Sequence, residues 1–271
     1  MAKEIVVYSV MIGAYDNYMP LDKNIMEPDL IDYFYITDNK KAKVEGYQMV
    51  YVDIIDGDNL KTSRYYKLKM CDFLKKYKYS IYYDGNVQVI NQLSKLIPYV
   101  EKADMAQFDY FVPFNVKCHF LTHYFGISQN KKKMFAKYAE YKSQGWHDNK
   151  INPTGKFIIR KYTSEMEAFL NDWYNDTVEM RRDEFTLHFN LWKHKIKFNM
   201  ISSLFIFQYF NINWHKTSAG KHNEGFNKII SPDKGKLINR LLNYKIIYVS
   251  LYTLQWLIFT IFTFFYTLFR F

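Results

Sequence analysis

The sequence predicts an α/β fold whose sheet is largely parallel and covered by helices. In the first half of the chain, short runs of β-branched, aliphatic and aromatic residues alternate with stretches of helical spacing. The runs are continuously apolar, which is typical of strands buried on both faces. A length of 271 residues and a hydrophobic content of 49% allow one sizeable core with an appendage.

The first half of the chain supplies four strands and one helix. Strands are expected at residues 4–12, 31–37, 47–53 and 79–83, and a helix is expected at residues 60–77. Each strand candidate is rich in residues that favour a pleated, half-buried surface. The helix candidate repeats apolar side chains at intervals of three and four residues, so it can bury one face against the sheet.

The second half has a looser pattern. The expected elements are helices at 91–102, 131–144 and 164–179, strands at 108–113 and 156–162, a polar turn at 181–184 that leads into another helix, and a polar loop at 211–235. The loop is rich in Asn, Gly, Lys and His, which are typical of irregular surface segments.

A segment of different character follows at residues 246–269, which contain no charged side chain. A helix of this length can cross a hydrocarbon core of about 30 Å. Four basic residues precede it, namely Lys234, Lys236, Arg240 and Lys245. By the positive-inside rule, they predict an N-terminal domain at the cytoplasmic face of a membrane. The alternatives are a helix that lies flat at the interface and a helix that docks on a hydrophobic partner.

The formal net charge of +10 favours partners that carry phosphate groups or an anionic membrane surface. No nucleic-acid motif accompanies the lysines, so a nucleic-acid partner is not expected. A Lys-rich genome explains the charge equally well.

Cys71 and Cys118 belong to no CxxC pair, so a zinc site is not expected, and two isolated thiols suit a reducing compartment.

The first candidate site is Asp84-Gly85-Asn86, which follows the strand expected at 79–83. Ligands of open α/β sheets bind beyond the carboxyl ends of the strands. A carboxylate there, with an amide oxygen two residues later, can hold Mg²⁺ or Mn²⁺ against a diphosphate. Glycine between them lets the backbone approach a substrate. The alternative is an ordinary Asp-Gly turn.

Two further groups could contact a nucleotide. Arg64 and Lys67 lie three residues apart and share a helix face, where they can bind phosphate. Gly13, Tyr15 and Asp38 lie in two loops that follow strands and could hold a base and a ribose. The alternatives are a solvated helix face and two routine loops.

The remaining candidates lie in the second half. Asp183 and Glu184 begin a helix, where an acidic pair can bind an acceptor or serve as a catalytic carboxylate, or can simply cap the helix. His215 and Lys221 lie in the polar loop, where they could bind a metal and a diphosphate. The alternative for this pair is a flexible loop without a ligand.

Taken in order, these motifs resemble the domain-of-unknown-function family numbered 616, which is regarded as glycosyltransferase-like. The similarity covers roughly residues 5–195. It is carried by Tyr8-Ser9 with Gly13-x-Tyr15-Asp16, Ile31-Asp32-Tyr33-Phe34 with Thr37-Asp38-Asn39, Arg64-x-x-Lys67, Ser80-Ile81-Tyr82-x-Asp84-Gly85-Asn86, Trp173, and Arg182-Asp183-Glu184-Phe185. The resemblance implies a GT-A-like domain with a mixed, mostly parallel sheet at residues 1–210. A polar loop and basic helix at 211–245 and a membrane-anchoring helix at 246–270 would follow it.

The chain is more distantly similar to the glycogenin and lipopolysaccharide galactosyltransferase type of enzyme. In that type, a DxD motif and a later His hold Mn²⁺, and a Gly and a Lys follow the His. His215, Gly220 and Lys221 resemble this late motif. The chain departs from the pattern at Asn86, which replaces the second Asp of DxD, and at His222, which replaces a Pro.

The resemblance implies a hexosyltransferase that uses a nucleotide diphosphate sugar in cell-surface polysaccharide synthesis. Its acceptor would be a saccharide or a lipid-linked saccharide. Mn²⁺ or Mg²⁺ would be held by Asp84, Asn86 and His215. The diphosphate would be neutralised by Arg64, Lys67 and Lys221, and the acceptor would be activated by Asp183 or Glu184. Two alternatives stay open, namely a non-catalytic module that binds sugar nucleotides or glycans, and a membrane-attached basic interaction protein.

Overall fold

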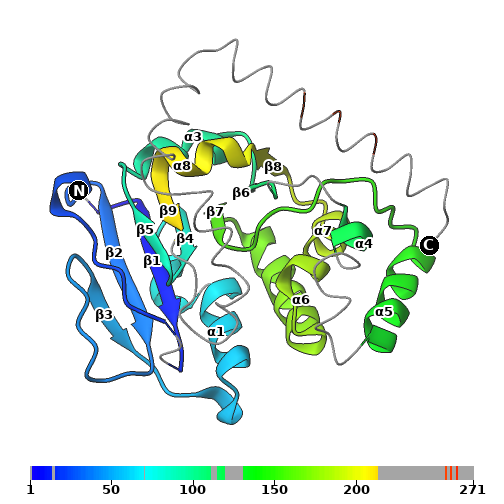
Figure 1. Cartoon of the computed structure of the whole chain (residues 1–271), viewed down its shortest axis with the longest axis horizontal. Coiled ribbons are helices and arrows are strands. Elements are labelled where there is room, and N and C mark those ends of the chain that lie inside the picture. Colours follow the sequence, from blue (N-terminus) through cyan, green and yellow to red (C-terminus); the bar gives the residue numbers. More distant parts are fainter. Residues whose placement is uncertain are drawn as a thin grey trace.

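The computed structural model describes residues 2–13, 16–69, 71–110, 115–119 and 131–212, together with Leu254, Leu257 and Ile261. The described chain forms a seven-stranded sheet with helices on both faces (Figure 1). The α/β class and the mostly parallel sheet predicted from the sequence are therefore confirmed.

The main sheet has the order β3-β2-β1-β4-β7-β6-β8. Its strands are β1 (Ile5–Met11), β2 (Ile31–Thr37), β3 (Gln48–Tyr51), β4 (Tyr79–Asp84), β6 (Met105–Phe108), β7 (Phe157–Lys161) and β8 (Phe198–Ile201). Strand β7 runs antiparallel to both of its neighbours, while the other pairs are parallel. The registers place Val10 beside Asp84 and Met11 beside Thr37, so β1, β2 and β4 end at the same edge.

A second, two-stranded sheet pairs β5 (Val87–Val89) with β9 (Phe210–Ile212) in antiparallel fashion. Neither β5, β8 nor β9 was expected from the sequence, because strands of three or four residues are too short to show a periodic pattern. The polar loop expected from residue 211 therefore begins later, and its remainder lies outside the described residues.

The α-helices are α1 (Asn59–Leu68), α2 (Asp72–Lys75), α3 (Pro98–Glu101), α4 (Val116–His119), α5 (Lys131–Ser143), α6 (Ser164–Met180), α7 (Asp183–Lys193) and α8 (Ile206–Tyr209). Short 3₁₀ turns occur at Lys23–Ile25, Ile55–Gly57, Ser94–Leu96 and Ser203–Phe205. The helices expected at 131–144 and 164–179 are confirmed. The segment 91–102 is only partly helical, and the strand expected at 108–113 lies earlier, at β6.

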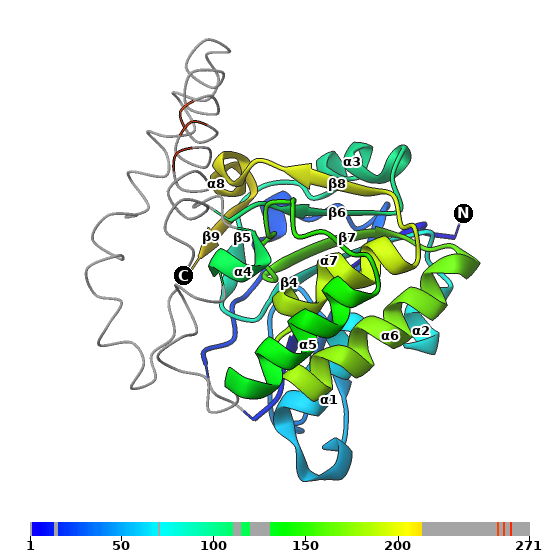
Figure 2. The ribbon, with the colours of Figure 1, turned by 90° about the vertical axis from the view of Figure 1, so that its right-hand side faces the viewer.

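Each face of the sheet has its own hydrophobic core. On one face, Val7, Ile81 and Ile159 pack with residues of α3, α8 and the small sheet. On the other face, Val6 and Ile158 pack with residues of α1, α2, α6 and α7, which Figure 2 shows on one side of the strands. Successive strand residues thus point to opposite cores, which explains why the strands are apolar throughout.

The helix expected at residues 60–77 is divided into α1 and α2, so that prediction was wrong in its extent. The backbone leaves the helical region at Lys69, which has φ −77° and ψ 123°. Two buried polar groups satisfy the carbonyls that a continued helix would use. Arg160 donates to the Leu68 carbonyl at 2.9 Å, and the Tyr8 hydroxyl donates to the Lys67 carbonyl at 3.1 Å. Helical spacing cannot reveal such tertiary bonds.

The hydrophobic helix expected at 246–270 lies almost entirely outside the described residues. Its three described members, Leu254, Leu257 and Ile261, are helical and exposed. Within the part of the chain that the structure describes, no helix combines the length and apolar character needed to cross a membrane.

Candidate functional site

A buried ion-pair cluster joins three segments that are distant in the sequence. Lys67 of α1 places its Nζ 2.7 Å from Oδ2 of Asp183, the first residue of α7, and 3.3 Å from Oδ1 of Asp84, the last residue of β4. The Lys67 side chain is only 2% exposed. Three of the residues singled out from the sequence therefore lie together at the carboxyl edge of the sheet.

Asp84 is surrounded by groups that favour its ionised form. Burial alone would raise its pKa, but Lys67, Lys156, the Tyr82 hydroxyl and Arg64 outweigh that effect, and the pKa of Asp84 is lowered. The Tyr82 hydroxyl donates to Oδ1 at 2.7 Å, and Lys156 Nζ lies 4.0 Å from Oδ2. Asp84 is consequently a carboxylate at neutral pH.

Asp183 is still more strongly held as an anion. Burial opposes its charge, yet Arg64 and Lys67 lower the pKa of Asp183 well below the usual range. Arg64 lies 3.6 Å from Oδ1, and Trp173 of α6 donates its indole N–H to the Asp183 carbonyl at 2.9 Å. Because α6 ends at Arg181 in a left-handed conformation, with φ 62°, α7 can start immediately and place Asp183 beside α1.

Glu184, in the first turn of α7, lies next to this cluster and contacts the turn that precedes β7. Its Oε1 accepts from the Gly155 N–H at 3.0 Å and from the Tyr110 hydroxyl at 3.3 Å. A Cβ on Gly155 would lie 3.0 Å from Oδ2 of Asp183 and 3.2 Å from Cγ of Glu184, so glycine permits the close approach of this turn. Gly155, Tyr110 and Lys156 were missed from the sequence. The Pro-Thr-Gly-Lys turn at 153–156 is the signal that could have pointed to Gly155 and Lys156.

The two loops that follow β1 and β2 meet at the same edge. The Gly13 N–H donates to Oδ1 of Asp38 at 2.9 Å, and Gly13 has a φ of +84°, which favours glycine. A Cβ at Gly13 would lie 2.5 Å from Nδ2 of Asn59 at the start of α1. Gly13 and Asp38 are therefore brought together as expected, whereas Tyr15 lies outside the described residues.

The expected metal ligands are brought together only in part. Asp84 ends β4 and the buried Asn86 follows two residues later, while His215 and Lys221 lie outside the described residues. Among the residues that are described, no group of three or more His, Cys, Asp or Glu could hold a metal ion. Two ammonium groups, those of Lys67 and Lys156, already face the Asp84 carboxylate. The described residues alone therefore do not fit a divalent cation.

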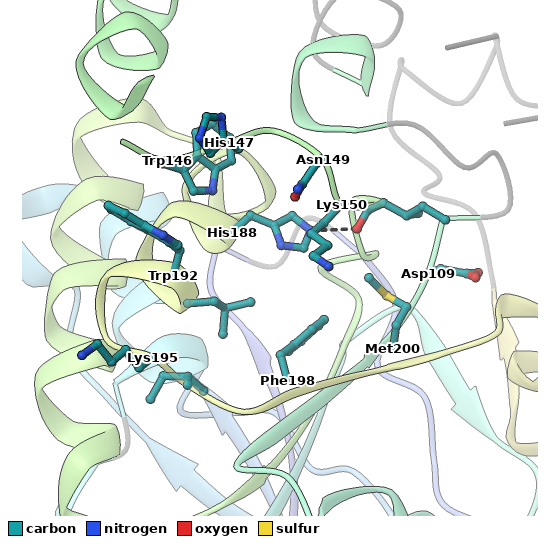
Figure 3. Close-up of a pocket in the computed structure, with 13 residues that line it drawn as sticks. Asp109, Trp146, His147, Asn149, Lys150, His188, Trp192, Lys195, Phe198 and Met200 are labelled. Carbon is teal, nitrogen blue, oxygen red and sulfur yellow. Dashed lines mark hydrogen bonds between the residues drawn. The ribbon is translucent and has the colours of Figure 1, made fainter. Parts of the chain in front are cut away.

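His188, one helical turn beyond Glu184, fixes the segment that carries Gly155. Its Nε2 lies 2.7 Å from the Ile151 carbonyl oxygen, so Nε2 carries the proton of a neutral imidazole and donates it (Figure 3). Burial lowers the pKa of His188 to about 4; the hydrogen bond to Ile151 opposes this shift, and Lys150 adds to it. His188 is therefore neutral at pH 7.

This shift predicts a loss of stability in mild acid. The unfolded imidazole has the ordinary pKa of 6.5 and binds a proton more readily than the folded one, so stability falls as the pH drops from 6.5 towards 4. At pH 5, the His188 contribution amounts to a loss of about 2 kcal/mol relative to pH 7. Urea denaturation of wild type and His188→Gln at both pH values measures it. An equal decrease in both proteins would refute the assignment.

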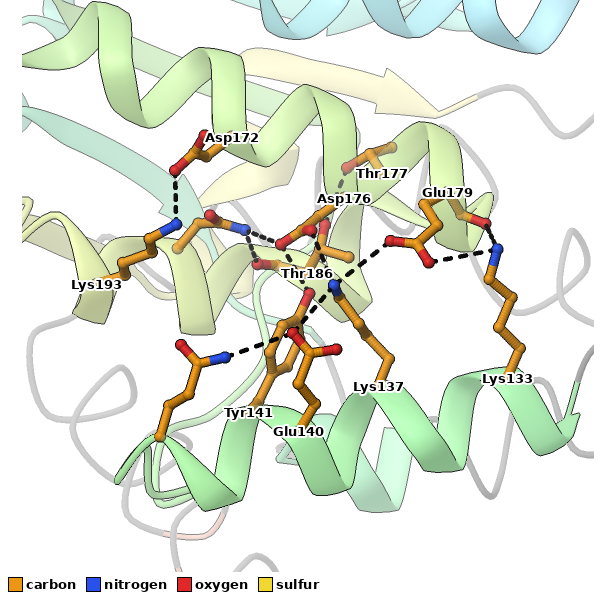
Figure 4. Close-up of polar contacts among 12 residues, drawn as sticks. Lys133, Lys137, Glu140, Tyr141, Asp172, Asp176, Thr177, Glu179, Thr186 and Lys193 are labelled. Atoms are coloured by element: carbon orange, nitrogen blue, oxygen red, sulfur yellow. Dashed lines mark hydrogen bonds and ion pairs between the residues drawn. The ribbon is translucent and has the colours of Figure 1, made fainter.

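A polar network holds α7 against α5 and α6 (Figure 4). Asp176 of α6 accepts from the Tyr141 hydroxyl at 2.9 Å and from Nδ2 of Asn190 at 2.9 Å, and Lys137 Nζ lies 3.4 Å from its other oxygen. Tyr141 and Asn190 are buried. Asp176 thus links α6 to α7 through Asn190 and to α5 through Tyr141, so the helix that begins with Asp183 and Glu184 is fixed by side-chain bonds to α6.

Comparison with known proteins assigns no family. No protein-family model matches the chain, and a search of curated proteins finds no match. The functional conclusion therefore rests on the motifs of the sequence and the geometry of this site.

Proposed function

We propose that the chain is a glycosyltransferase of GT-A type, which transfers a hexose from a nucleotide diphosphate sugar to a saccharide or lipid-linked acceptor. One observation carries this proposal. Arg64, Lys67 and Lys156 gather around Asp84 and Asp183 at the carboxyl edge of a mostly parallel sheet. Open α/β sheets bind their ligands at this edge, and the Gly13–Asp38 pair lies there as well.

The cations divide into two roles. Lys67 is buried between two carboxylates, so it positions Asp84 and Asp183. The side chains of Arg64 and Lys156 keep 20% and 22% of their surface exposed, so they can reach a diphosphate. Stabilisation of the negative charge that develops on a leaving diphosphate is usually the largest catalytic contribution. The proposal also includes Lys221 as a residue that would neutralise the diphosphate, on the basis of the sequence motif formed with His215 and Gly220.

Glu184 is the proposed base for the acceptor, with Asp183 as its positioning neighbour. In the net reaction, the acceptor hydroxyl transfers its proton to the Glu184 carboxylate and its oxygen bonds to the anomeric carbon. The bond between that carbon and the diphosphate oxygen breaks, and the nucleoside diphosphate leaves. The N–H of Gly155 and the hydroxyl of Tyr110 orient the Glu184 carboxylate for this role.

Neither metal binding nor membrane attachment is required for the transfer step proposed above. The sequence motif assigns Mn²⁺ or Mg²⁺ to Asp84, Asn86 and His215, but Lys67 and Lys156 already face Asp84, so no step above depends on a metal. Residues 246–270 would attach the protein to the cytoplasmic face of a membrane, near a lipid-linked acceptor.

The test is a thermal-shift screen of nucleoside diphosphates with and without Mn²⁺, combined with a nucleotide-sugar hydrolysis assay. A nucleotide at about 100 times its Kd stabilises the native state by roughly 2.7 kcal/mol. We expect Asp84→Asn to reduce turnover by about 100-fold, because an amide no longer matches the surrounding cations. Asp172→Asn, which removes a surface carboxylate paired with Lys193, is the matched control. Full turnover by Asp84→Asn would refute the proposal.

The pairing of Asp84 and Asp183 with Lys67 also favours a second function, a non-catalytic module that binds sugar nucleotides. In such a module the ion-pair cluster would only support the nucleotide-binding site and would take no part in a reaction. The same assays separate the two functions, because a module binds the nucleotide in the thermal-shift screen yet hydrolyses no nucleotide sugar.

A further inference from the structure

A cavity lies beside the candidate site, between α7 and the edge strand β8. Its volume is about 870 Å³, within the usual range for pockets that take small molecules. Figure 3 shows Trp192 and Lys195 on one side, His188 and Lys150 in the middle, and Asp109 with Met200 on the other. The cavity begins one helical turn from Glu184, since Glu184 and His188 lie four residues apart on α7.

The cavity offers an aromatic platform. Trp192 is 46% exposed, which is unusual for so large an apolar ring, and it lines the cavity. The Trp192 ring also packs against the ring of Phe189, and the two ring centroids lie 5.8 Å apart. A half-exposed flat ring that packs on a second aromatic ring suits the C–H face of a pyranose. Phe198 and Met200, on one face of β8, extend the apolar floor.

The charged groups of the cavity are predominantly basic. Lys150 and Lys195 are exposed, and neither forms an ion pair with a carboxylate in the described part of the chain. Asp109 is the acidic residue of the lining, but it is buried and its Oδ1 accepts from the Ser203 N–H at 2.7 Å. His188 is neutral at pH 7. The lining therefore presents two available cations to a ligand.

We propose that this cavity binds an acidic oligosaccharide, one whose sugars carry carboxylates. The Trp192 ring would stack on a sugar face, and Lys150 and Lys195 would bind the carboxylates. The inference rests on the proposed function in one respect only: the bound glycan would be the acceptor, extending along α7 towards Glu184. The shared segment 151–155 connects the two sites, because Ile151 contacts His188 and Gly155 contacts Glu184.

Calorimetric titration of the full chain without nucleotide tests the proposal, with tetragalacturonate as the acidic probe and maltotetraose as the neutral one. We expect tetragalacturonate to bind at least tenfold more tightly, with an affinity that falls as salt is added. Trp192→Ala is expected to weaken its binding about tenfold. Lys150→Gln with Lys195→Gln is expected to abolish the preference for the acidic probe. Lys197→Gln, which removes the same charge outside the cavity lining, is the matched control.

Equal affinity for both probes, or tetragalacturonate binding that Trp192→Ala leaves unchanged, would overturn the proposal. Displacement of the probe by inorganic phosphate at equal concentration would also overturn it, because the cavity would then be a simple anion site. The nucleotide thermal shift distinguishes the two proposals. If nucleotides bind and tetragalacturonate does not, the cavity proposal fails while the transferase proposal stands. If tetragalacturonate binds and no nucleotide does, the cavity proposal stands and the transferase proposal fails.

Discussion

We expect Lys67→Met to lower the free energy of unfolding by about 3–5 kcal/mol, the usual cost of removing one partner from a buried ion pair. The Lys67 ammonium lies 2.7 Å from Asp183 and 3.3 Å from Asp84, and it is almost fully buried. Its removal leaves two carboxylates in a low-dielectric environment with less compensation. Denaturant unfolding at pH 7 measures the effect. Turnover should be lost as well, since Asp84 and Asp183 would no longer be held in place.

Two further variants test whether the loss of stability comes from the buried ion pairs of Lys67. Lys61→Met, on the same helix, removes a surface ion pair with Asp56 and should have little effect on stability. Adding Asp183→Asn to Lys67→Met should recover part of the loss, because it removes one of the unpaired charges. If Lys67→Met is as stable as Lys61→Met, the ion pairs of Lys67 with Asp84 and Asp183 are solvated, and Lys67 does not position the two carboxylates.

The second large effect is expected at Trp173, where Trp173→Ala should cost about 3–5 kcal/mol. The indole is buried, stacks on Phe169 with ring centroids 5.5 Å apart, and donates to the Asp183 carbonyl. The substitution therefore leaves a cavity between α6 and the sheet and frees the first residue of α7. Urea denaturation measures the loss of stability.

Trp173→Phe separates packing from hydrogen bonding. It keeps an aromatic ring beside Phe169 but removes the indole N–H, so a smaller cost of about 1–2 kcal/mol is expected. Its effect on turnover should exceed that of Phe169→Leu, which leaves the bond to Asp183 intact. Equal turnover in the two variants would show that the bond to the Asp183 carbonyl does not position the site.

The sequence predicted the first half of the site better than the second. Asp84, Gly13 and Asp38 each follow an apolar strand, and parallel strands place their carboxyl ends at one edge, so their proximity follows from the strand pattern alone. Lys67 and Arg64 follow from helical spacing on the connecting helix. These inferences need only local patterns and the rule that parallel connections return to the same edge.

The rest depends on tertiary structure that local patterns do not encode. Lys156 and Gly155 reach the site because β7 is inserted antiparallel beside β4, an arrangement that its apolar sequence does not specify. The break after α1 depends on Arg160, which is 80 or more residues away from its partners. Strands β5, β8 and β9 are too short for periodicity, so their pairing emerges only when the sheet and its helices are in place.

The reversed strand β7 has a consequence for how the sequence can change. Lys156, immediately before β7, and Arg160 within it lie four positions apart, so both point to the face of the sheet that α1 covers. Lys156 faces Asp84, while Arg160 holds the end of the helix that carries Lys67. A one-residue slip of β7 would turn both cations to the opposite core at once. An insertion or deletion between the two residues would put their side chains on opposite faces, so only one of the two contacts could be kept, whereas a shift of the whole strand would remove both.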